Sequence, residues 1–475
     1  MTNNDLSQSF WRSWAAGEGV NSFESLSLWI SEQNRNTPVA VRRISLDKCA
    51  PWHFNSAVGR IENESQSFFQ IAGLRMYRKD IVSGKFDPIV EQPIIIQDEI
   101  GFLGIICKEF DGVMHFLMQA KIEPGNVNKV QISPTTQATR SNFMRLHGGK
   151  QPSYVEYFMH SERYDVVVDQ IQSEQSSRFL GKRNRNMIIV VNGEVPLRPT
   201  HQWMTLGQIM HMMEYDNLVN MDARTVISCL PWSFWQKMPK DIDDKLSPWG
   251  RLVANSYSAS LSVRNLNAAY RLLNDYKTFD TTTREVVPLT DLTDWVIDSY
   301  GIRHRQSYPF KVIYCDIYIE GREVRHWTQP LFEASGQALF ALAGCEFKGV
   351  ARFLVHINPE IGCFDKVEFA PTVQLEALAS HEPDLVESFV LERVADGKGL
   401  VSDVLLSEEG GRFYCEQNRN VILWLDECPS ALTQDALPEG YLWLDLATLN
   451  LLLRAGNVVN IQLRNLLSLL RVRKG

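Results

Sequence analysis

Hydrophobic and polar residues alternate with a period of two between Gly101 and Gln137, and this alternation predicts strands. In the clearest example one side carries Val113, His115, Leu117, Gln119 and Lys121, and the other carries Met114, Phe116, Met118 and Ala120. A second strand, Ala351 to Asn358, repeats the division into an apolar and a more polar side. The polar side of each strand either lines a ligand cavity or faces solvent.

The chain repeats itself, because residues 92–137 return as residues 329–374 at a constant spacing of 237. The repeated positions include Gln92-Pro93, Glu109-Phe110, Phe116-Leu117, Glu123, Pro134-Thr135 and Gln137, and, after a small change of spacing, Arg178-Phe179, which returns as Arg412-Phe413. A spacing this long predicts two tandem domains and not a solenoid. We place the boundary in the charged, proline-containing segment 237–245. The predicted domains, called the first half and the second half below, are residues 1–236 and 237–475.

Helical patterns open and close each half, so the predicted fold class is α+β. The opening helices carry Phe23, Leu26 and Ile30 after a capping Ser22 in the first half, and Leu266, Ala269, Tyr270 and Leu273 in the second half. Each half is predicted to close with two helices. Their N-caps are Thr205 and Asn220 in the first half, and Asp445 and Asn460 in the second. The aromatic residues Phe10, Trp11 and Trp14 fit core packing better than an exposed docking stripe.

Composition argues against several classes of protein. The 475 residues are 44% hydrophobic and 22% charged, as in soluble globular proteins. A net charge of −8 gives no basic surface for nucleic acid. The polar start is unlike a signal peptide, no run is long enough to span a membrane, and the eight scattered cysteines fit reduced thiols. We therefore expect a cytoplasmic protein that is not attached to a membrane.

The common cofactor motifs are missing from the sequence. It contains no nucleotide-binding glycine motif, no H-E-x-x-H and no G-x-S-x-G, and its histidines form no metal pair at helical spacing. We expect neither a cofactor nor a metal. The most polar stretch, residues 138–149, combines arginines, hydroxyls, an imidazole and glycines, which suits phosphate and sugar recognition, although such a loop is often plain surface. The second half has Leu375 to Ala379 at this place, which predicts a helix.

Several strings of residues carry a resemblance to a known family. They are Gln92-Pro93-Ile94-Ile95, then residues 115–126 (HFLMQAKIEPGN), then residues 131–142 (QISPTTQATRSN), followed by His147-Gly148-Gly149. Together with the repeat, they resemble the signature of the NDP-hexose 2,3-dehydratases over nearly the whole chain. One departure lies upstream, where the family tends to have a histidine before a glycine and two aromatic residues. Residues 56–60 (SAVGR) contain no histidine, so no role is carried over to that position.

The resemblance implies a fold, a reaction and partners. The fold is a pair of tandem Nudix-like domains without a functional Nudix box, assembled as a homodimer. The reaction is the elimination of water across carbons 2 and 3 of dTDP-4-keto-6-deoxy-D-glucose in deoxysugar biosynthesis, without a metal. The product is a dTDP-3,4-diketo-2,6-dideoxyhexose, which an NADPH-dependent 3-ketoreductase would consume. Two other classes stay open: a non-catalytic nucleotide-sugar-binding protein, and a nucleotide-sugar epimerase or isomerase.

The elimination needs a proton acceptor, a donor that holds the enolate oxygen and a donor for the leaving hydroxyl. Lys121 and His115 are the candidate acid and base, with Glu123 tuning them, because the second half keeps a glutamate but replaces the lysine and the histidine. The candidate substrate-binding residues are Gln119, Gln137, Arg140, Asn142, Arg145, His147, Tyr157 and Trp52. The alternatives are a buried structural role for His115, a solvated side chain for Lys121, and core packing for Trp52.

Overall fold

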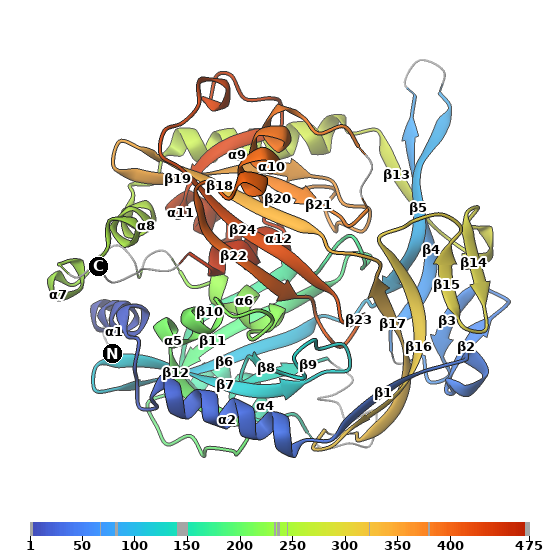
Figure 1. Cartoon of the computed structure of the whole chain (residues 1–475), viewed down its shortest axis with the longest axis horizontal. Helices are drawn as coiled ribbons and strands as arrows, with labels where there is room; N and C mark the ends of the chain where they lie inside the picture. Colours follow the sequence, from blue (N-terminus) through green and yellow to red (C-terminus); the bar gives the residue numbers. More distant parts are fainter. Residues whose placement is uncertain are drawn as a thin grey trace.

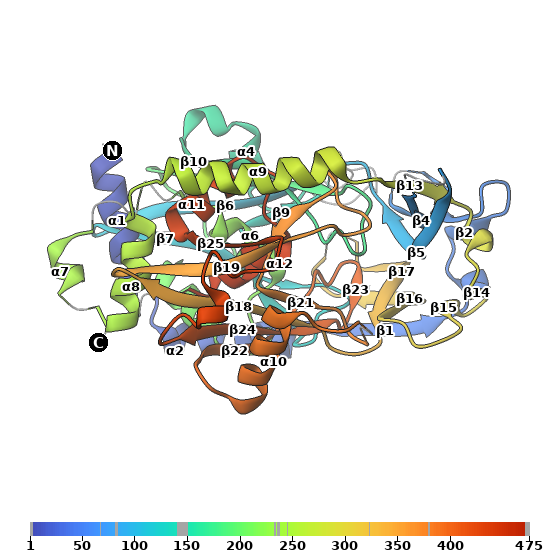
Figure 2. The ribbon, with the colours of Figure 1, turned by 90° about the horizontal axis from the view of Figure 1, so that it is seen from above.

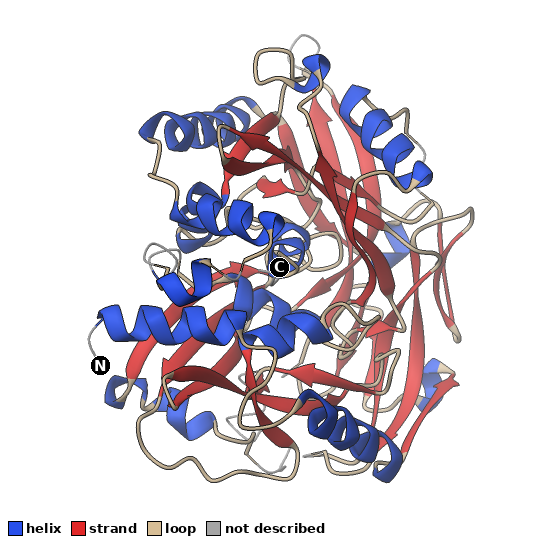
Figure 3. Cartoon of the chain, turned by 60° about the vertical axis from the view of Figure 1, so that its left-hand side comes forward, coloured by secondary structure: helices blue, strands red, loops and turns tan. Residues whose placement is uncertain are grey.

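The computed structural model describes residues 3–470 apart from 67, 81–83, 140–150, 232–233, 235–237, 245, 323 and 379–380. Four sheets organise the chain (Figure 1). Each half contributes one seven-stranded central sheet, and two outer sheets lie together at one end of the molecule (Figures 1 and 2). Helices lie against these sheets, so the fold is α+β, as predicted (Figure 3).

The two central sheets have the same pattern of strand pairing. The first consists of β6 (Gly101–Phe110), β7 (Val113–Ile122), β8 (Val130–Ser133), β9 (Thr136–Ala138), β10 (Asp165–Ser173), β11 (Arg183–Val190) and β12 (His201–Thr205). The second consists of β18 (Leu339–Phe347), β19 (Val350–Asn358), β20 (Glu368–Ala370), β21 (Val373–Leu375), β22 (Leu400–Ser407), β24 (Gln417–Leu425) and β25 (Tyr441–Asp445). Both are antiparallel except for one parallel pair, β6 with β11 and β18 with β24. The repeat in the sequence is therefore also a repeat in strand pairing.

The outer sheets each contain a strand from the other half. One consists of β2 (Trp52–Asn55), β3 (Arg60–Asn63), β4 (Gln70–Lys79), β5 (Phe86–Ile96) and β13 (Thr282–Val287). The other consists of β1 (Val39–Ile44), β14 (Trp295–Asp298), β15 (Gly301–His304), β16 (Phe310–Ile319), β17 (His326–Ala334) and β23 (Phe413–Tyr414). β1 pairs with β16 and β13 pairs with β4, both antiparallel, as the dark-blue β1 beside the gold β16 shows in Figure 1. We call this reciprocal arrangement the strand exchange.

The helices begin where the capping residues predicted. They are α1 (Asn3–Ala15), α2 (Phe23–Asn36), α4 (Val155–Met159), α5 (Leu206–Met212), α6 (Met221–Ser228), α7 (Lys240–Asp243), α8 (Pro248–Ser258), α9 (Val263–Phe279), α10 (Leu385–Asp396), α11 (Leu446–Arg454) and α12 (Ile461–Ser468). Ser22, Thr205, Asn220, Asp445 and Asn460 each accept a hydrogen bond from a backbone N–H of the first turn. The prediction of a helix from Leu375 is wrong for the described residues, because Leu375 ends β21 and a turn follows.

The core joins the two halves. Phe10 and Trp11 are fully buried and Trp14 nearly so, so the aromatic residues of α1 belong to this core and not to a docking stripe. Helices α6 and α12 pack against each other between the central sheets, where Arg464 Nε donates to Thr225 Oγ1 at 2.8 Å. Arg224 Nη2 in turn donates to Ser407 O at 2.8 Å, which links α6 to the end of β22. The loops at these strand ends are consequently held by helices of the other half.

Candidate active site

A cavity of about 580 Å³ lies where the first central sheet meets the outer sheets. Its volume is in the range of small-molecule sites. The strand exchange places residues of both halves around it. The polar lining includes Lys121, Glu123, Gln137, Glu174, Lys182 and Asp222 from the first half, and Arg322, His326, Glu409 and Arg412 from the second. The cavity is thus completed only by the folding of the whole chain.

A chain of hydrogen bonds fixes the polar residues at the end of β7. Lys121 Nζ lies 3.2 Å from Glu123 Oε1, and both side chains are at least nine-tenths buried. Gln137 Nε2 donates to the same oxygen at 3.1 Å, and Asn220 Nδ2 donates to Gln137 Oε1 at 3.3 Å. Because Asn220 also caps α6, the helix start holds this row of side chains in place. Glu123 Oε2 is buried and has no hydrogen-bond partner within the described part of the chain.

The second half repeats this row with one change. Gln374 Nε2 donates to Glu360 Oε1 at 2.9 Å, and Asn460 Nδ2 donates to Gln374 Oε1 at 2.8 Å. Burial raises the pKa of Glu360 to about 8, with nearby Glu376 adding to the shift. The change is Asn358, which stands where the first half has Lys121, so the ammonium is specific to the first half.

Three further carboxyl groups face the same cavity. Burial, together with the negative charge of Glu409, raises the pKa of Glu174 to about 7. Burial and the charge of Glu123 raise the pKa of Glu409 to about 7 in the same way. The pKa of Asp222 lies well above its ordinary value, because its side chain is buried and Glu174 and Glu409 lie nearby. Such shifts suit groups that exchange protons near neutral pH.

Cationic groups balance these acids. Burial lowers the pKa of Lys182 to about 8, and its Nζ donates to Glu99 O. Arg412 comes from the second half, and its guanidinium carbon lies 4.3 Å from the centroid of the Phe69 ring. Arg322 Nη1 donates to the carbonyl oxygen of Ile122 at 3.0 Å, and Ile122 directly follows Lys121 in the chain. A diphosphate entering the cavity would therefore meet several positive side chains.

One wall of the cavity is aromatic. Trp52, Phe68, Phe69 and Phe179 line it. The ring centroids of Trp52 and Phe69 are 4.6 Å apart, and Trp52 Nε1 donates to Thr328 O at 2.9 Å. Trp52 is 4% exposed, so it packs into a core and borders the cavity at the same time.

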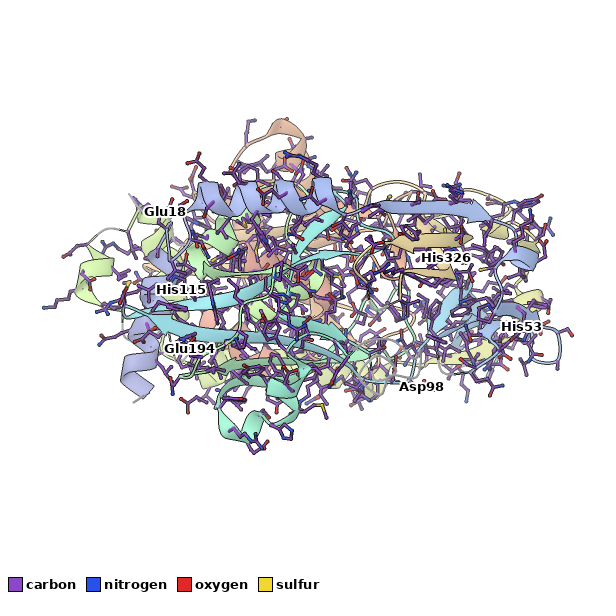
Figure 4. The ribbon with its side chains drawn as sticks, turned by 90° about the horizontal axis from the view of Figure 1, so that it is seen from below. Glu18, His53, Asp98, His115, Glu194 and His326 are labelled. Carbon is purple, nitrogen blue, oxygen red and sulfur yellow. The ribbon has the colours of Figure 1, made fainter. Side chains whose placement is uncertain are left out.

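Of the residues predicted from the sequence, Lys121, Glu123, Gln137 and Trp52 come together around this cavity. His115 does not line it. His115 Nε2 accepts from Val20 N at 3.1 Å and Nδ1 lies 2.9 Å from Val113 O, so the buried imidazole is neutral and fully paired. Burial also lowers its pKa. Figure 4 shows His115 in the left part of the molecule and His326, which borders the cavity, in the right part.

The other predicted residues lie elsewhere or outside the described residues. Gln119 stands opposite His201 in the pairing of β7 with β12 and does not line the cavity. Tyr157 stacks on Tyr164 at 5.6 Å between ring centroids and borders a separate cavity. Arg140, Asn142, Arg145 and His147 lie outside the residues that the structure describes.

Sequence reasoning missed Glu174, Lys182, Asp222, Glu409 and Arg412. The repeat did mark Arg412, as the counterpart of Arg178, but gave no reason to place it in a first-half cavity. No group of three His, Cys, Asp or Glu side chains could hold a metal ion among the described residues. None of the eight cysteines forms a disulfide. Within the described ranges, no helix has the length and apolar character needed to cross a membrane.

Comparison with known proteins identifies the family of the chain. A family model described as NDP-hexose 2,3-dehydratase matches the chain twice, over residues 23–230 and 267–470. A protein of Saccharopolyspora spinosa, named dTDP-4-dehydro-6-deoxy-alpha-D-glucopyranose 2,3-dehydratase, is 37% identical over 447 residues, 93% of this chain and 89% of the relative. Proteins of the same name from Amycolatopsis orientalis and Streptomyces violaceoruber are 36% and 34% identical, over 94% and 93% of this chain and 89% and 96% of their own lengths. The chain therefore belongs to the NDP-hexose 2,3-dehydratase family.

Proposed function

We propose that the protein is a lyase that eliminates water across carbons 2 and 3 of dTDP-4-keto-6-deoxy-D-glucose and yields a dTDP-3,4-diketo-2,6-dideoxyhexose in deoxysugar biosynthesis. The names of its relatives support the substrate. The observation that carries the proposal is the Lys121–Glu123 pair, buried in a cavity that also holds cationic and aromatic side chains. This arrangement supplies a proton acceptor and a hydrogen-bond donor for the enolate oxygen. It also supplies cationic groups for the diphosphate and aromatic groups for the thymine base.

The two members of the pair have different roles in this proposal. The ketone at carbon 4 acidifies the proton on carbon 3. Glu123 Oε2 has no hydrogen-bond partner among the described residues, so this oxygen is available to accept that proton. Lys121, held 3.2 Å from the other carboxylate oxygen, donates to the carbon 4 oxygen as it gains negative charge. Gln137 and Asn220 position Glu123, and Arg412 and Lys182 bind the diphosphate.

The test is an incubation of the purified protein with dTDP-4-keto-6-deoxy-D-glucose, with a 3-ketoreductase and NADPH present to trap the unstable diketone. Mass spectrometry of the trapped sugar should show the loss of one water. Unchanged substrate that carries deuterium from D₂O at carbon 3 or 5 would identify an epimerase or isomerase instead. Binding without any exchange or loss would identify a nucleotide-sugar-binding protein, and either outcome would refute the lyase.

The wider setting follows the same proposal. The common strand pairing of the central sheets supports an origin of the two halves, 1–236 and 237–475, from one Nudix-like domain. We propose a cytoplasmic homodimer that needs no cofactor and passes its product to an NADPH-dependent 3-ketoreductase. Sedimentation of the purified protein checks the dimer, and a coupled assay with the reductase checks the transfer.

A further inference from the structure

The proposed elimination needs a third group, because hydroxide is a poor leaving group unless it receives a proton. Lys121 and Glu123 serve the carbon 3 and carbon 4 side of the sugar. Asp222 lines the same cavity from the first turn of α6 and is 1% exposed. Its Oδ2 is buried and has no hydrogen-bond partner in the described residues. A buried carboxyl oxygen that lacks a partner within the protein is available to a ligand.

The second half offers an internal comparison for this residue. Asn220 and Asn460 cap α6 and α12, so the residue two places further on is Asp222 in one half and Gln462 in the other. The same kind of replacement separates Lys121 from Asn358. Asn220, Arg224, Glu123 and Gln137, which surround these positions, return unchanged as Asn460, Arg464, Glu360 and Gln374. The half that holds the large cavity thus carries ionisable groups at positions where the other half carries amides.

In a third pair the ionisable residue again lines the cavity, although it comes from the second half. Phe413 N donates to Glu409 O at 3.0 Å, and Phe179 N donates to Gln175 O at 2.9 Å, so Glu409 and Gln175 occupy the same place in matching loops. Amides keep the hydrogen-bonding capacity of carboxyl groups but hold no transferable proton. In all three pairs the residue that lines the cavity can transfer a proton, whereas its counterpart in the other half cannot.

The surroundings of Asp222 favour its protonated form. Glu174, Glu409 and Glu123 bring negative charge to it from three separate segments, while Lys121 is the opposing cation. A carboxyl group in such a place holds its proton more tightly than a carboxyl group in water, and it gives the proton up when negative charge develops on an adjacent oxygen. The departing hydroxyl of the sugar is such an oxygen.

Resting on the proposed function, we propose that Asp222 is the catalytic acid that protonates the carbon 2 hydroxyl as it leaves. The proton of carbon 3 passes to Glu123, and the electrons of that bond form the enolate. As the double bond between carbons 2 and 3 forms, the bond from carbon 2 to oxygen breaks, and the oxygen takes the proton of Asp222 and leaves as water. Glu123 then returns its proton to carbon 2, and the enol hydroxyl gives its proton to the Asp222 carboxylate. Both carboxyl groups regain their starting state without an oxidant or a reductant.

The test compares two leaving groups in Asp222→Asn. With the natural substrate, kcat should fall by about 10²- to 10⁴-fold, the usual contribution of a general acid. With the 2-deoxy-2-fluoro analogue, fluoride leaves without a proton, so kcat should fall less than about tenfold. The variant should still exchange the carbon 3 proton of the natural substrate with D₂O, because Glu123 and Lys121 are intact. The surface variant Asp169→Asn, which breaks only the exposed pair with Arg185, should behave as the wild type.

Each other outcome is decisive. Equal losses with both leaving groups, or no loss with the natural substrate, overturn the role of Asp222. Failure of the wild-type enzyme to release water refutes the lyase itself, and the inference with it. If Asp222→Asn does not fold, Asp222→Gln, which installs the residue of the second half, is judged by the same ratio between the two leaving groups.

Discussion

Lys121 Nζ lies 3.2 Å from Glu123 Oε1 at the end of β7, and the two charges are buried together. Removal of either partner leaves the other charge uncompensated in a site of low polarity. The second half keeps the glutamate and has Asn358 in place of the lysine, so the repeat provides a control at an equivalent position.

We expect Lys121→Ala to lower kcat by about 10²- to 10⁴-fold, because the enolate oxygen loses its donor. Asn358→Ala, at the matching position, should leave kcat within a few-fold of the wild type. Steady-state assays coupled to the 3-ketoreductase measure both values. Full activity of Lys121→Ala would remove this residue from the mechanism.

Arg412→Ala should weaken substrate binding more than it slows the reaction. The guanidinium lies over Phe69 and donates to Gln97 Oε1 at 3.4 Å, and the substrate diphosphate would gain a charge-assisted hydrogen bond from it. Loss of one such bond corresponds to about 1.5–3 kcal/mol, so KM should rise about 10- to 150-fold. Arg393→Ala removes another arginine that lies over a ring, that of Phe389 on α10, and should leave KM unchanged. A lower kcat with unchanged KM would contradict the binding role.

Glu409 should make the protein less stable as the pH rises. Its pKa is raised from 4.5 to about 7 in the folded state, so the stabilisation from proton binding is complete below pH 4.5 and is lost as the pH rises through about 7. Glu409→Gln removes this loss. Its free energy of unfolding should equal that of the wild type near pH 4.5 and exceed it by about 1–3 kcal/mol at pH 8.

Urea denaturation at the two pH values measures that difference. The same substitution at Glu427, an exposed residue, should change the free energy of unfolding by less than about 0.5 kcal/mol at either pH. A Glu409→Gln advantage that is equally large at both pH values would mean that the effect comes from packing and not from titration.

Thr135 and Thr372 should contribute equally to the free energy of unfolding. Thr135 Oγ1 accepts from Ile106 N at 2.9 Å and donates to Leu117 O, and Thr372 Oγ1 accepts from Ala343 N at 2.8 Å and donates to Leu354 O. Valine at either position leaves two buried backbone groups unpaired, which destabilises the fold by about 1–3 kcal/mol. Thermal unfolding of Thr135→Val and Thr372→Val should therefore show similar losses. A loss at one position alone would show that the two halves are not energetically equivalent.

The sequence predicted those features of the structure that depend on residues close together in the chain. The N-caps Thr205, Asn220, Asp445 and Asn460 were found because a cap acts within one turn. Lys121, Glu123 and Gln137 were found together because one strand and one turn separate them. His115 shares the side of β7 with Lys121, but six residues of strand span about 20 Å, so the two side chains cannot serve one site.

The strand exchange could not be predicted in this way. β1 and β13 are each six residues long and each follows a helix, so neither pattern specifies which half supplies the partner strand. For the same reason Glu409 and Arg412 were not assigned to the first-half cavity. Their placement depends on pairings between residues more than 200 positions apart in the chain.

The strand exchange also limits how enzymes of this family can be recombined. A chimaera joined between the halves would pair β1 of one parent with β16 of the other, and β13 with β4 in the same mismatched way. Val39 faces Ile319 and Thr282 faces Arg78 across those pairings, so side chains selected in different proteins would have to fit. Recombination should preserve folding best when the crossover points lie between β1 and β2 and between β13 and β14. Each outer sheet then takes all its strands from one parent: β2 to β5 and β13 from one, and β1, β14 to β17 and β23 from the other.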